Sequence, residues 1–360
     1  MFADRLKLAR KKAGFSMQEL SLRIVPTVTA QAISKYENGQ MMPSSAVLVG
    51  LAKALDVSLD FLMGGQVAEL VGVEFRKHTG TSAKDRAQAE AIVIENLENY
   101  LAIEAILELA AVKDPFGDLR CEAEADLAHA EKMAVALRQQ WNLGEDPIPS
   151  MTDLLEEQGI RVIEAALPER FHGLTCTVKR SGGKADTDVI VISSRSNVER
   201  KRFTLAHELA HRLMLEPADG TVPLEKVMNR FAGAFLAPAN HLRREFGEGR
   251  HGITYHELMR LKKSYGMSAA AMLYRLADTG LLPRATVDYA FRTYAQGWRT
   301  QEPEPIGNGE GLGAFEKPSR FERLVYRACA EEMISPLRVA QLLKRSLAEV
   351  EAEIRGPRAA

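Results

Sequence analysis

Cysteine is scarce in this sequence, which limits the kinds of site that the chain can build. The three cysteines, Cys121, Cys176 and Cys329, are odd in number and lie far apart. Such spacing argues against a disulfide framework and against a cysteine-ligated metal site. We therefore interpret them as small hydrophobic residues.

Long apolar runs are also missing. No uncharged apolar stretch approaches the eighteen or so residues that a membrane-spanning helix needs, and the opening letters MFADRLKLARKK lack the apolar core of a secretory signal. These absences predict a cytoplasmic protein with no membrane partner. With 360 residues, 46% hydrophobic and 26% charged, the chain is expected to fold into two or three domains with sizeable cores.

The net charge of the chain is −1, but its first 35 residues are basic. Between Met1 and Lys35 the sequence holds seven basic residues against the two acids Asp4 and Glu19. A local excess of this kind attracts phosphates, although a basic run is more often a solvated surface. The charge is therefore weak support for a nucleic-acid partner.

The first seventy residues have the pattern of five short helices. Apolar residues recur at helical spacing in the first of them, and Ser16 followed by Glu19 is typical of the start of the second. The second helix is expected to include Leu22 and Ile24 and to stop near Pro26. The other three are expected over residues 29–38, 44–55 and 58–63.

A tight connection between the second and third helices is typical of a helix-turn-helix domain. In such a domain the third helix enters the major groove of DNA. The letters QAISKYENG, within residues 1–65, resemble the Cro/C1-type (XRE family) repressor domain. The resemblance implies a double-stranded DNA operator as partner. It also implies that six positions face the DNA, namely Gln18, Thr29, Ala30, Gln31, Ser34 and Lys35.

The chemistry of these positions suits DNA. Gln31 could pair with an adenine edge, while Gln18, Ser34 and Lys35 could hold base or phosphate oxygens. The connection at residues 25–28 is longer than the common turn of this family. The alternative is a helical oligomerisation module that does not bind DNA, because a fold alone does not fix a function.

The middle of the chain alternates helices with a small sheet. Residues 66–117 are expected to form a helical linker, because AEAIVIENLENYLAIEAILELA is amphipathic and rich in helix formers. A further helix is predicted from Ala123 to Trp141. The letters MTDLLEEQGIRVIEA predict a helix that turns at Gly159 into a strand, and LTCTVKR and DVIVIS predict a hairpin in the same sheet.

The stretch RFTLAHELAHRLM places two histidines one turn apart on one helix face. His207 and His211 are close enough to bind one metal ion, and Glu208 can reach a water on that ion without ligating it. A capping box of Ser196 and Glu199 is expected to start this helix. The alternative is a buried helix with two hydrogen-bonded core histidines.

Hydrolytic zinc sites usually combine three protein ligands with one position for water, so a third ligand is needed. The residues alone leave Glu225, Glu216 and Asp219 as candidates. A second HEL stretch, beginning at His256, has Arg260 where another histidine would stand. We interpret that stretch as an ordinary surface helix.

The stretch RFTLAHELAHRLM, followed by EKVMNRFAGAFLAP, resembles the ImmA/IrrE family of metallopeptidases over residues 120–280. The resemblance implies a Zn²⁺ cofactor with His207, His211 and Glu225 as ligands and Glu208 as the catalytic residue. Two positions depart from the family pattern. Met228 stands where a small residue is usual, and Val227 where an acid is common.

A hydrolytic mechanism follows from these residues. Zn²⁺ acidifies water and polarises a carbonyl, while Glu208 takes a proton from the water and delivers it to the leaving amine. The strand at residues 189–192 could offer an edge for an extended peptide. His172, His241 and His251 are candidates for stabilising the oxyanion, although each is more often a surface or packing histidine.

The C-terminal part is expected to begin with a linker and to continue as helices. TQEPEPIGNGEGLGAFEKPS is rich in Gly, Pro and Glu and is expected to be a loop or mobile linker. The helical stretch beyond it resembles another small helix-turn-helix. We favour packing or dimerisation over a second DNA contact for it.

The predicted fold is mainly α and multidomain, with an α+β zincin-like metallopeptidase domain in the middle. The predicted parts are a five-helix Cro/C1-type domain at 1–65, a linker at 66–117, the metallopeptidase domain at 118–282, a linker at 283–320 and a helical segment at 321–360.

The predicted function is a homodimeric transcriptional regulator that carries a zinc endopeptidase, with a role in stress response. The peptidase would cleave its own chain or a partner repressor of the XRE kind. The alternative is a regulator whose zinc domain is a sensor with little or no peptidase activity. A toxin or antitoxin module is a third class.

Overall fold

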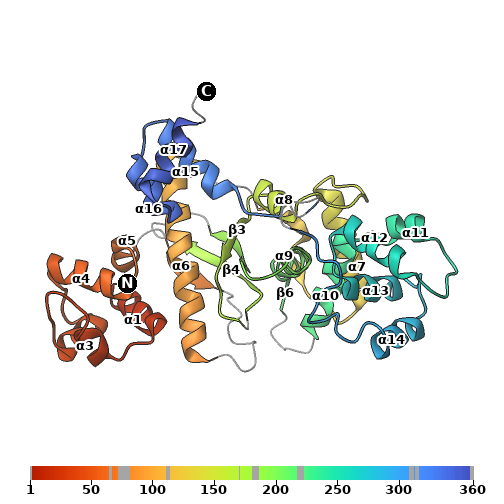
Figure 1. Ribbon diagram of the computed structural model, residues 1–360, viewed down its shortest axis with the longest axis horizontal. Coiled ribbons are helices and arrows are strands. Elements are labelled where there is room, and N and C mark those ends of the chain that lie inside the picture. The colour runs from red at the N-terminus through yellow and green to blue at the C-terminus, as the bar shows by residue number, and fades with distance from the viewer. Residues whose placement is uncertain are drawn as a thin grey trace.

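The computed structural model describes residues 2–64, 67–71, 82–110, 114–169, 171–180, 186–216, 223–307, 312 and 316–356. Within these residues the chain is mainly helical, with a small mixed sheet near the middle of the molecule (Figure 1). This arrangement confirms the predicted fold class. None of the described helices is long and apolar enough to cross a membrane.

The N-terminal unit contains the five predicted helices. They are α1 (Phe2–Ala13), α2 (Met17–Ser21), α3 (Ala30–Glu37), α4 (Ser45–Leu55) and α5 (Leu59–Met63). Hydroxyl side chains cap the last four, because Ser16, Thr29, Ser44 and Ser58 each accept a hydrogen bond from a backbone N–H of the first turn. The capping box of Ser16 and Glu19 is present. Their apolar faces meet in one core.

The second helix is shorter than predicted. It ends at Ser21 rather than near Pro26, and Leu22 is 84% exposed. The chain leaves the helix so that Ile24 can enter the core and the Val25 carbonyl can approach α4 at Gly50. A Cβ atom at Gly50 would lie 2.4 Å from that carbonyl oxygen, so the contact needs glycine.

The central sheet has the strand order β1-β4-β5-β3. The predicted hairpin is present as β4 (Gly173–Arg180) and β5 (Thr187–Ser193), which pair antiparallel. β3 (Arg161–Ala165) pairs parallel with β5, and β1 (Val67–Val71) pairs antiparallel with β4. The segment predicted as a helical linker therefore contributes a strand to this sheet as well as a helix.

This order corrects the prediction that residues 189–192 offer a free edge. β5 lies between β4 and β3 and pairs with both along its length. The pairing uses the backbone groups on both sides of the strand, so no peptide can add to it.

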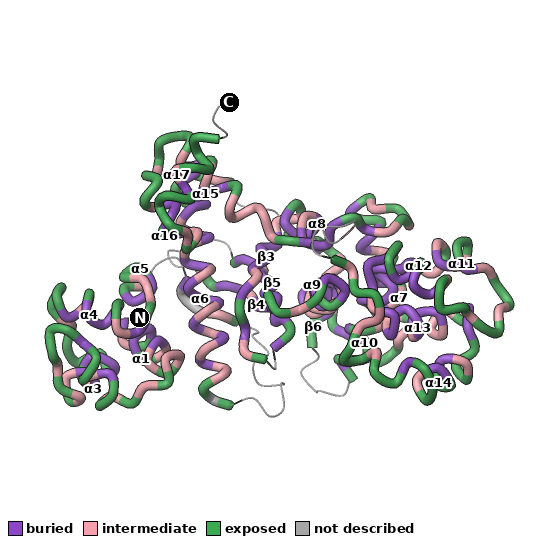
Figure 2. The backbone as a smooth tube through the Cα atoms, viewed as in Figure 1, coloured by how far each residue is buried: buried purple, intermediate pink, exposed green. Residues whose placement is uncertain are grey.

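Helix α6 (Ala83–Ile106) has 24 residues and packs on three sides. It contributes to the core of the N-terminal unit, to the core beside the sheet and to the core of the C-terminal helices. Its exposed residues are confined to its ends (Figure 2). A buried ion pair of 2.8 Å between Arg5 of α1 and Glu98 also fixes the N-terminal unit on this helix.

The remaining elements of the middle region surround one large core. They are the 3₁₀ helix η1 (Gly117–Leu119), the two-stranded parallel pair β2 (Cys121–Glu122) and β6 (Met214–Leu215), and the helices α7 (Leu127–Gln140), α8 (Met151–Glu157), α9 (Val198–Leu213), α10 (Leu224–Leu236), α11 (Ala239–Phe246), α12 (Tyr255–Tyr265), α13 (Ala269–Asp278) and α14 (Arg284–Arg292). Helix α10 packs against both α7 and α9.

Three short helices close the described chain, namely α15 (Arg320–Ala330), α16 (Pro336–Leu343) and α17 (Leu347–Arg355). They share a core with the end of α6 (Figure 1). Arg338 of α16 lies 2.9 Å from Asp60 of α5, so the segment also contacts the N-terminal unit. The segment therefore packs within the chain, which is one of the two roles expected for it.

The segment before these helices differs from a mobile linker. Its first part forms α14, and two of its later acids lie in the protein interior. Glu302 pairs with the buried Lys262 at 2.9 Å, and Glu316 pairs with the buried Arg202 at 2.5 Å. The described part of the Pro- and Glu-rich stretch is a loop, as predicted, but these buried ion pairs attach it to α12 and α9.

Candidate metal centre

Helix α9 carries the two histidines, and it begins differently from the prediction. Its N-cap is Asn197, whose side chain accepts a hydrogen bond from the backbone N–H of Arg200. Ser196 does not cap the helix. Glu199 does not complete a capping box, because its carboxylate is buried and accepts a hydrogen bond from Lys262 at 2.8 Å.

His207, His211 and Glu225 converge at the point where α9 and α10 face each other. The Nε2 atoms of the two histidines are 3.2 Å apart. Glu225 reaches them with one carboxylate oxygen 3.4 Å from His207 Nε2 and the other 3.9 Å from His211 Nε2. Glu225 belongs to the first turn of α10, so the packing of α10 on α9 forms the cluster.

These distances fit a tetrahedral zinc site. Zinc bonds of about 2.0–2.2 Å to nitrogen and oxygen place neighbouring ligand atoms about 3.3 Å apart in a tetrahedron. The three potential ligand atoms all lie within 4.8 Å of one another. Two imidazoles and one carboxylate are also a ligand set of catalytic zinc sites, in which water takes the fourth position.

Asn229, one turn after Glu225 on α10, orients the first histidine. Its Oδ1 atom lies 3.0 Å from His207 Nδ1. When Nδ1 carries the proton and donates this bond, the Nε2 lone pair points toward Glu225 and His211. Burial lowers the pKa of the His207 imidazole, but Glu225, Glu208 and Asn229 outweigh that effect and hold its pKa above the usual value.

Glu208 is next to the cluster but is not part of the three-residue set. It is half-buried on α9, where the first residue of β4, Gly173, lies against the same helix. A Cβ atom at Gly173 would lie 2.3 Å from Thr204 and 3.7 Å from Glu208. The missing side chain lets the strand approach the helix closely beside the Glu208 carboxylate.

Arg212 attaches the histidine helix to the sheet. Its Nε atom donates to Asp188 of β5 at 2.9 Å, and its terminal nitrogen donates to Thr177 of β4. Arg120 donates to the other oxygen of Asp188 at 3.1 Å. Sequence reasoning missed these residues, because they come from separate segments with no common spacing.

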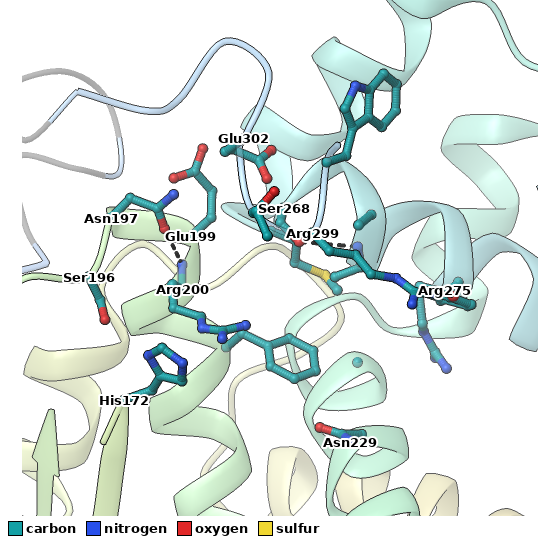
Figure 3. Close-up of a pocket in the computed structure, with 18 of the residues that line it drawn as sticks. His172, Ser196, Asn197, Glu199, Arg200, Asn229, Ser268, Arg275, Arg299 and Glu302 are labelled. Atoms are coloured by element: carbon teal, nitrogen blue, oxygen red, sulfur yellow. Dashed lines mark hydrogen bonds between the residues drawn. The ribbon is translucent and has the colours of Figure 1, made fainter. Parts of the chain in front are cut away.

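A groove of about 1210 Å³ opens beside the cluster (Figure 3). Asn229 and Lys226 line it from α10, and Phe203 and Arg200 line it from α9. His172 is the one oxyanion candidate that lines this groove. The imidazole of His241 instead contacts Tyr265 at 2.7 Å, and His251 lies in the loop before α12.

The two positions that depart from the family pattern do not reach the groove. Val227 and Met228 are both fully buried in the large core. Asp219, one of the three candidates for the third ligand, lies outside the described residues. Glu216 is exposed just after β6, and the described three-residue cluster does not include it.

The predicted DNA-facing residues lie along the start of α2 and on α3. Gln18, Thr29, Gln31 and Lys35 are exposed, whereas Ala30 and Ser34 are half-buried. The residues of α3 that face the core are Ile33 and Tyr36. The exposed surface of α3 lies far from the metal cluster, on the opposite side of α6 (Figure 1).

Comparisons with known proteins agree with this two-part organisation. The family described as IrrE N-terminal-like domain matches residues 155–277, and the helix-turn-helix family matches residues 6–62. The chain is similar to Radiation response metalloprotease IrrE of Deinococcus deserti, with 34% identity over 169 residues. This match covers 42% of the chain and 56% of the relative, so the chain spans just over half of that protein.

Two further relatives match the N-terminal part. The HTH-type transcriptional regulator YqaE of Bacillus subtilis is 31% identical over 104 residues, which cover 27% of the chain and 88% of the relative. The SPbeta prophage-derived HTH-type transcriptional regulator YonR of the same organism is 38% identical over 69 residues, which cover 19% and 62%. No solved structure matches the chain.

Proposed function

The chain belongs to the helix-turn-helix transcriptional regulators of the XRE type and carries an IrrE/ImmA metallopeptidase domain, and from this premise we propose that it is a regulator with a zinc-dependent endopeptidase activity. The peptidase cleaves its own chain or a partner repressor of the XRE kind and thereby switches gene expression. The similarity to the Radiation response metalloprotease of Deinococcus deserti supports a stress as the inducing signal.

One observation carries the hydrolytic part of this proposal. Two imidazoles and a carboxylate converge with ligand-like spacing, and a further glutamate stands beside them on the same helix. A metal site that serves only structure needs no additional carboxylate beside it. The positions of His207, His211 and Glu225 therefore support a catalytic centre with Glu208 as its acid–base group.

Each residue of the site has its own role in the proposed hydrolysis. A bound Zn²⁺ would acidify water and polarise the carbonyl of the scissile peptide bond. Glu208 accepts the proton of the attacking water and then donates it to the nitrogen of the leaving amine. Asn229 holds His207 in the tautomer that keeps Nε2 available, and Arg212 fixes α9 against the sheet.

A sensor is the second candidate function. The groove beside the cluster has the volume of a small-molecule site, so a ligand could enter it without being cleaved. In that case the chain would bind Zn²⁺ and change its DNA affinity without any hydrolysis.

Cleavage assays separate the two functions. The purified chain with Zn²⁺ is incubated alone and with an XRE-type repressor, beside the matched Glu208→Gln variant. We expect fragments whose rate of formation is about 10²–10⁴-fold lower in the variant. A rate of self-cleavage that does not change on dilution indicates cleavage within one chain. Identical fragment patterns with the variant would favour the sensor.

We also propose that the regulator pairs on DNA. A two-fold symmetric homodimer binds an operator whose half-sites mirror that symmetry. Sedimentation of the chain with one half-site and with a two-half-site duplex tests this, because a monomer would occupy each half-site independently.

A further inference from the structure

The groove lies along α9 and α10 beside the metal cluster. Asn229, which contacts His207, lines it, whereas His207, His211 and Glu225 are not among its lining residues. Phe203 lies one turn before His207 on α9, and Arg200 lies almost one turn further. Asn229 and Gly233 follow Glu225 at one-turn intervals on α10. Seven helical residues at 1.5 Å each place Arg200 about 10 Å along the axis from His207, so the groove can hold the residues that flank a bond lying at the cluster.

Basic side chains without a carboxylate partner line this groove. Among the described residues, Arg195, Arg200, Lys226 and Arg299 make no ion pair. Arg200 projects into the groove near His172 (Figure 3). The walls remove part of its water, which lowers the pKa of its guanidinium, and no carboxylate of the described residues offsets that loss.

The acidic side chains of the groove are mostly neutralised by pairing. Glu199 and Glu302 both pair with the buried Lys262, and Asp278 pairs with Arg230 at 3.0 Å. Glu169, an exposed lining residue, makes no ion pair within the described residues. Among the described lining residues, four cationic groups and one carboxylate therefore make no ion pair, and Glu199 and Glu302 share the single charge of Lys262.

Apolar rings form part of the opposite wall. Tyr274 stacks on Phe291 with ring centroids 4.9 Å apart, and Arg299 packs over both rings. Trp298 lines the groove from the segment after α14, and Phe203 lines it from α9. The groove therefore offers a peptide both aromatic surface and positive charge.

We propose that this groove binds an acidic, partly apolar segment of a separate polypeptide and places the neighbouring peptide bond at the metal cluster. Arg195, Arg200 and Lys226 are specificity-determining residues that pair with substrate carboxylates, and the rings of Phe203 and Trp298 hold its apolar side chains. This inference rests on the proposed peptidase function and names the class of its substrate.

Binding is measured separately from hydrolysis, so the two ideas can fail independently. The probes are two fluorescent twelve-residue peptides, one alternating Glu with Leu and one alternating Lys with Leu. Anisotropy titrations use the full chain with Zn²⁺ and the Glu208→Gln substitution, which slows turnover. The test variant adds Arg200→Gln and Lys226→Gln, and its matched control adds Arg260→Gln and Lys132→Gln, two exposed positions outside the groove.

We expect the Glu peptide to bind more tightly than the Lys peptide and to weaken as salt is raised. In the test variant its affinity falls about three- to tenfold, the range for two partly exposed ion pairs. In the control variant it is unchanged.

Equal binding of both peptides, or an unchanged affinity in the test variant, would overturn the inference. If instead the Glu peptide binds as expected but no repressor is cleaved by the unsubstituted chain, the peptidase proposal fails while the groove assignment stands.

Discussion

The Oδ1 atom of Asn229 lies 3.0 Å from the Nδ1 atom of His207, across the interface of α9 and α10. This contact ties the orientation of one potential metal ligand to the helix that supplies another, Glu225. The two helices thus position the site jointly.

Removing this contact should weaken metal binding. We expect Asn229→Ala to lower the affinity for Zn²⁺ about 10- to 100-fold, because the imidazole loses the partner that fixes its tautomer and its orientation. Competition with a chromogenic chelator measures the affinity. Asn240→Ala, which removes an exposed amide on α11, is the control and should leave it unchanged. An unaltered affinity in Asn229→Ala would mean that the contact is incidental.

The identity of the third ligand can be tested with two glutamates. Glu225→Ala should reduce Zn²⁺ affinity by more than about 100-fold, the upper end of the effect of an outer partner, because it removes a ligand. Glu216→Ala should retain the affinity of the unsubstituted chain, because the described cluster does not include Glu216. Metal content after dialysis measures both. The reverse order of effects would move the site to the end of α9.

Lys262 makes four contacts with no exposure to solvent. It donates to Glu199 at 2.8 Å and to the carbonyls of Pro303 and Glu304 at 2.8 Å, and it pairs with Glu302 at 2.9 Å. Lys262→Met should lower the free energy of unfolding by about 3–5 kcal/mol, because it leaves buried carboxylates unpaired.

The adjacent lysine provides the control for this variant. Lys263 is exposed and pairs with Glu304, so Lys263→Met should cost at most about 1 kcal/mol. Denaturant unfolding of both variants measures the difference. Equal losses would show that the buried pairs do not contribute more than a surface pair.

Glu156 should make the stability depend on pH. Burial raises the pKa of its carboxyl to about 7, against a partly compensating hydrogen bond from the backbone of Arg320. The folded protein therefore holds a proton that the unfolded chain has lost between about pH 4.5 and 7, so stability falls as the pH rises through this window.

Glu156→Gln removes that penalty. We expect the variant to be more stable than the unsubstituted chain at pH 8, by up to about 3 kcal/mol, and to show no such gain at pH 4.5. Thermal unfolding at the two pH values checks this. A gain of the same size at both would have a cause other than ionisation.

The residues predicted to face DNA should affect operator binding in different ways. Gln31→Ala should weaken binding to the operator by about 1–3 kcal/mol and relax its preference at one base pair. Lys35→Ala should weaken binding to all sequences and reduce the salt slope by about one. Lys53→Ala, exposed on α4, should change neither. Gel-shift titrations at several salt concentrations distinguish the three.

Local patterns carried most of the correct predictions. The five N-terminal helices follow from hydroxyl caps and apolar spacing, and the hairpin follows from two neighbouring segments with strand patterns. The pairing of His207 with His211 needs only one turn of helix. Each of these signals lies within about ten residues of the element that it predicts.

The incorrect predictions concern residues whose contacts lie in distant segments of the chain. The spacing of Glu199 from Ser196 is that of a capping box. In the structure the Glu199 carboxylate is instead buried and pairs with Lys262 of α12. The strand at 189–192 looked like an edge because nothing local shows that β3 will pair with its far side. For the same reason, the local sequence around Glu302 and Glu316 does not predict their burial. Each is buried by an ion pair with a distant residue, Glu302 with Lys262 and Glu316 with Arg202.

The three-sided packing of α6 has a consequence for how this architecture can be divided. A gene fragment that stops before residue 83 would leave the apolar surface that meets Ala91 and Ile94 bare, and one that starts there would leave Ala91 and Ile94 themselves uncovered. The helix-turn-helix unit and the metallopeptidase domain are therefore not independent units. Any recombination that exchanges one of them has to transplant α6 with it, or redesign a whole helix face.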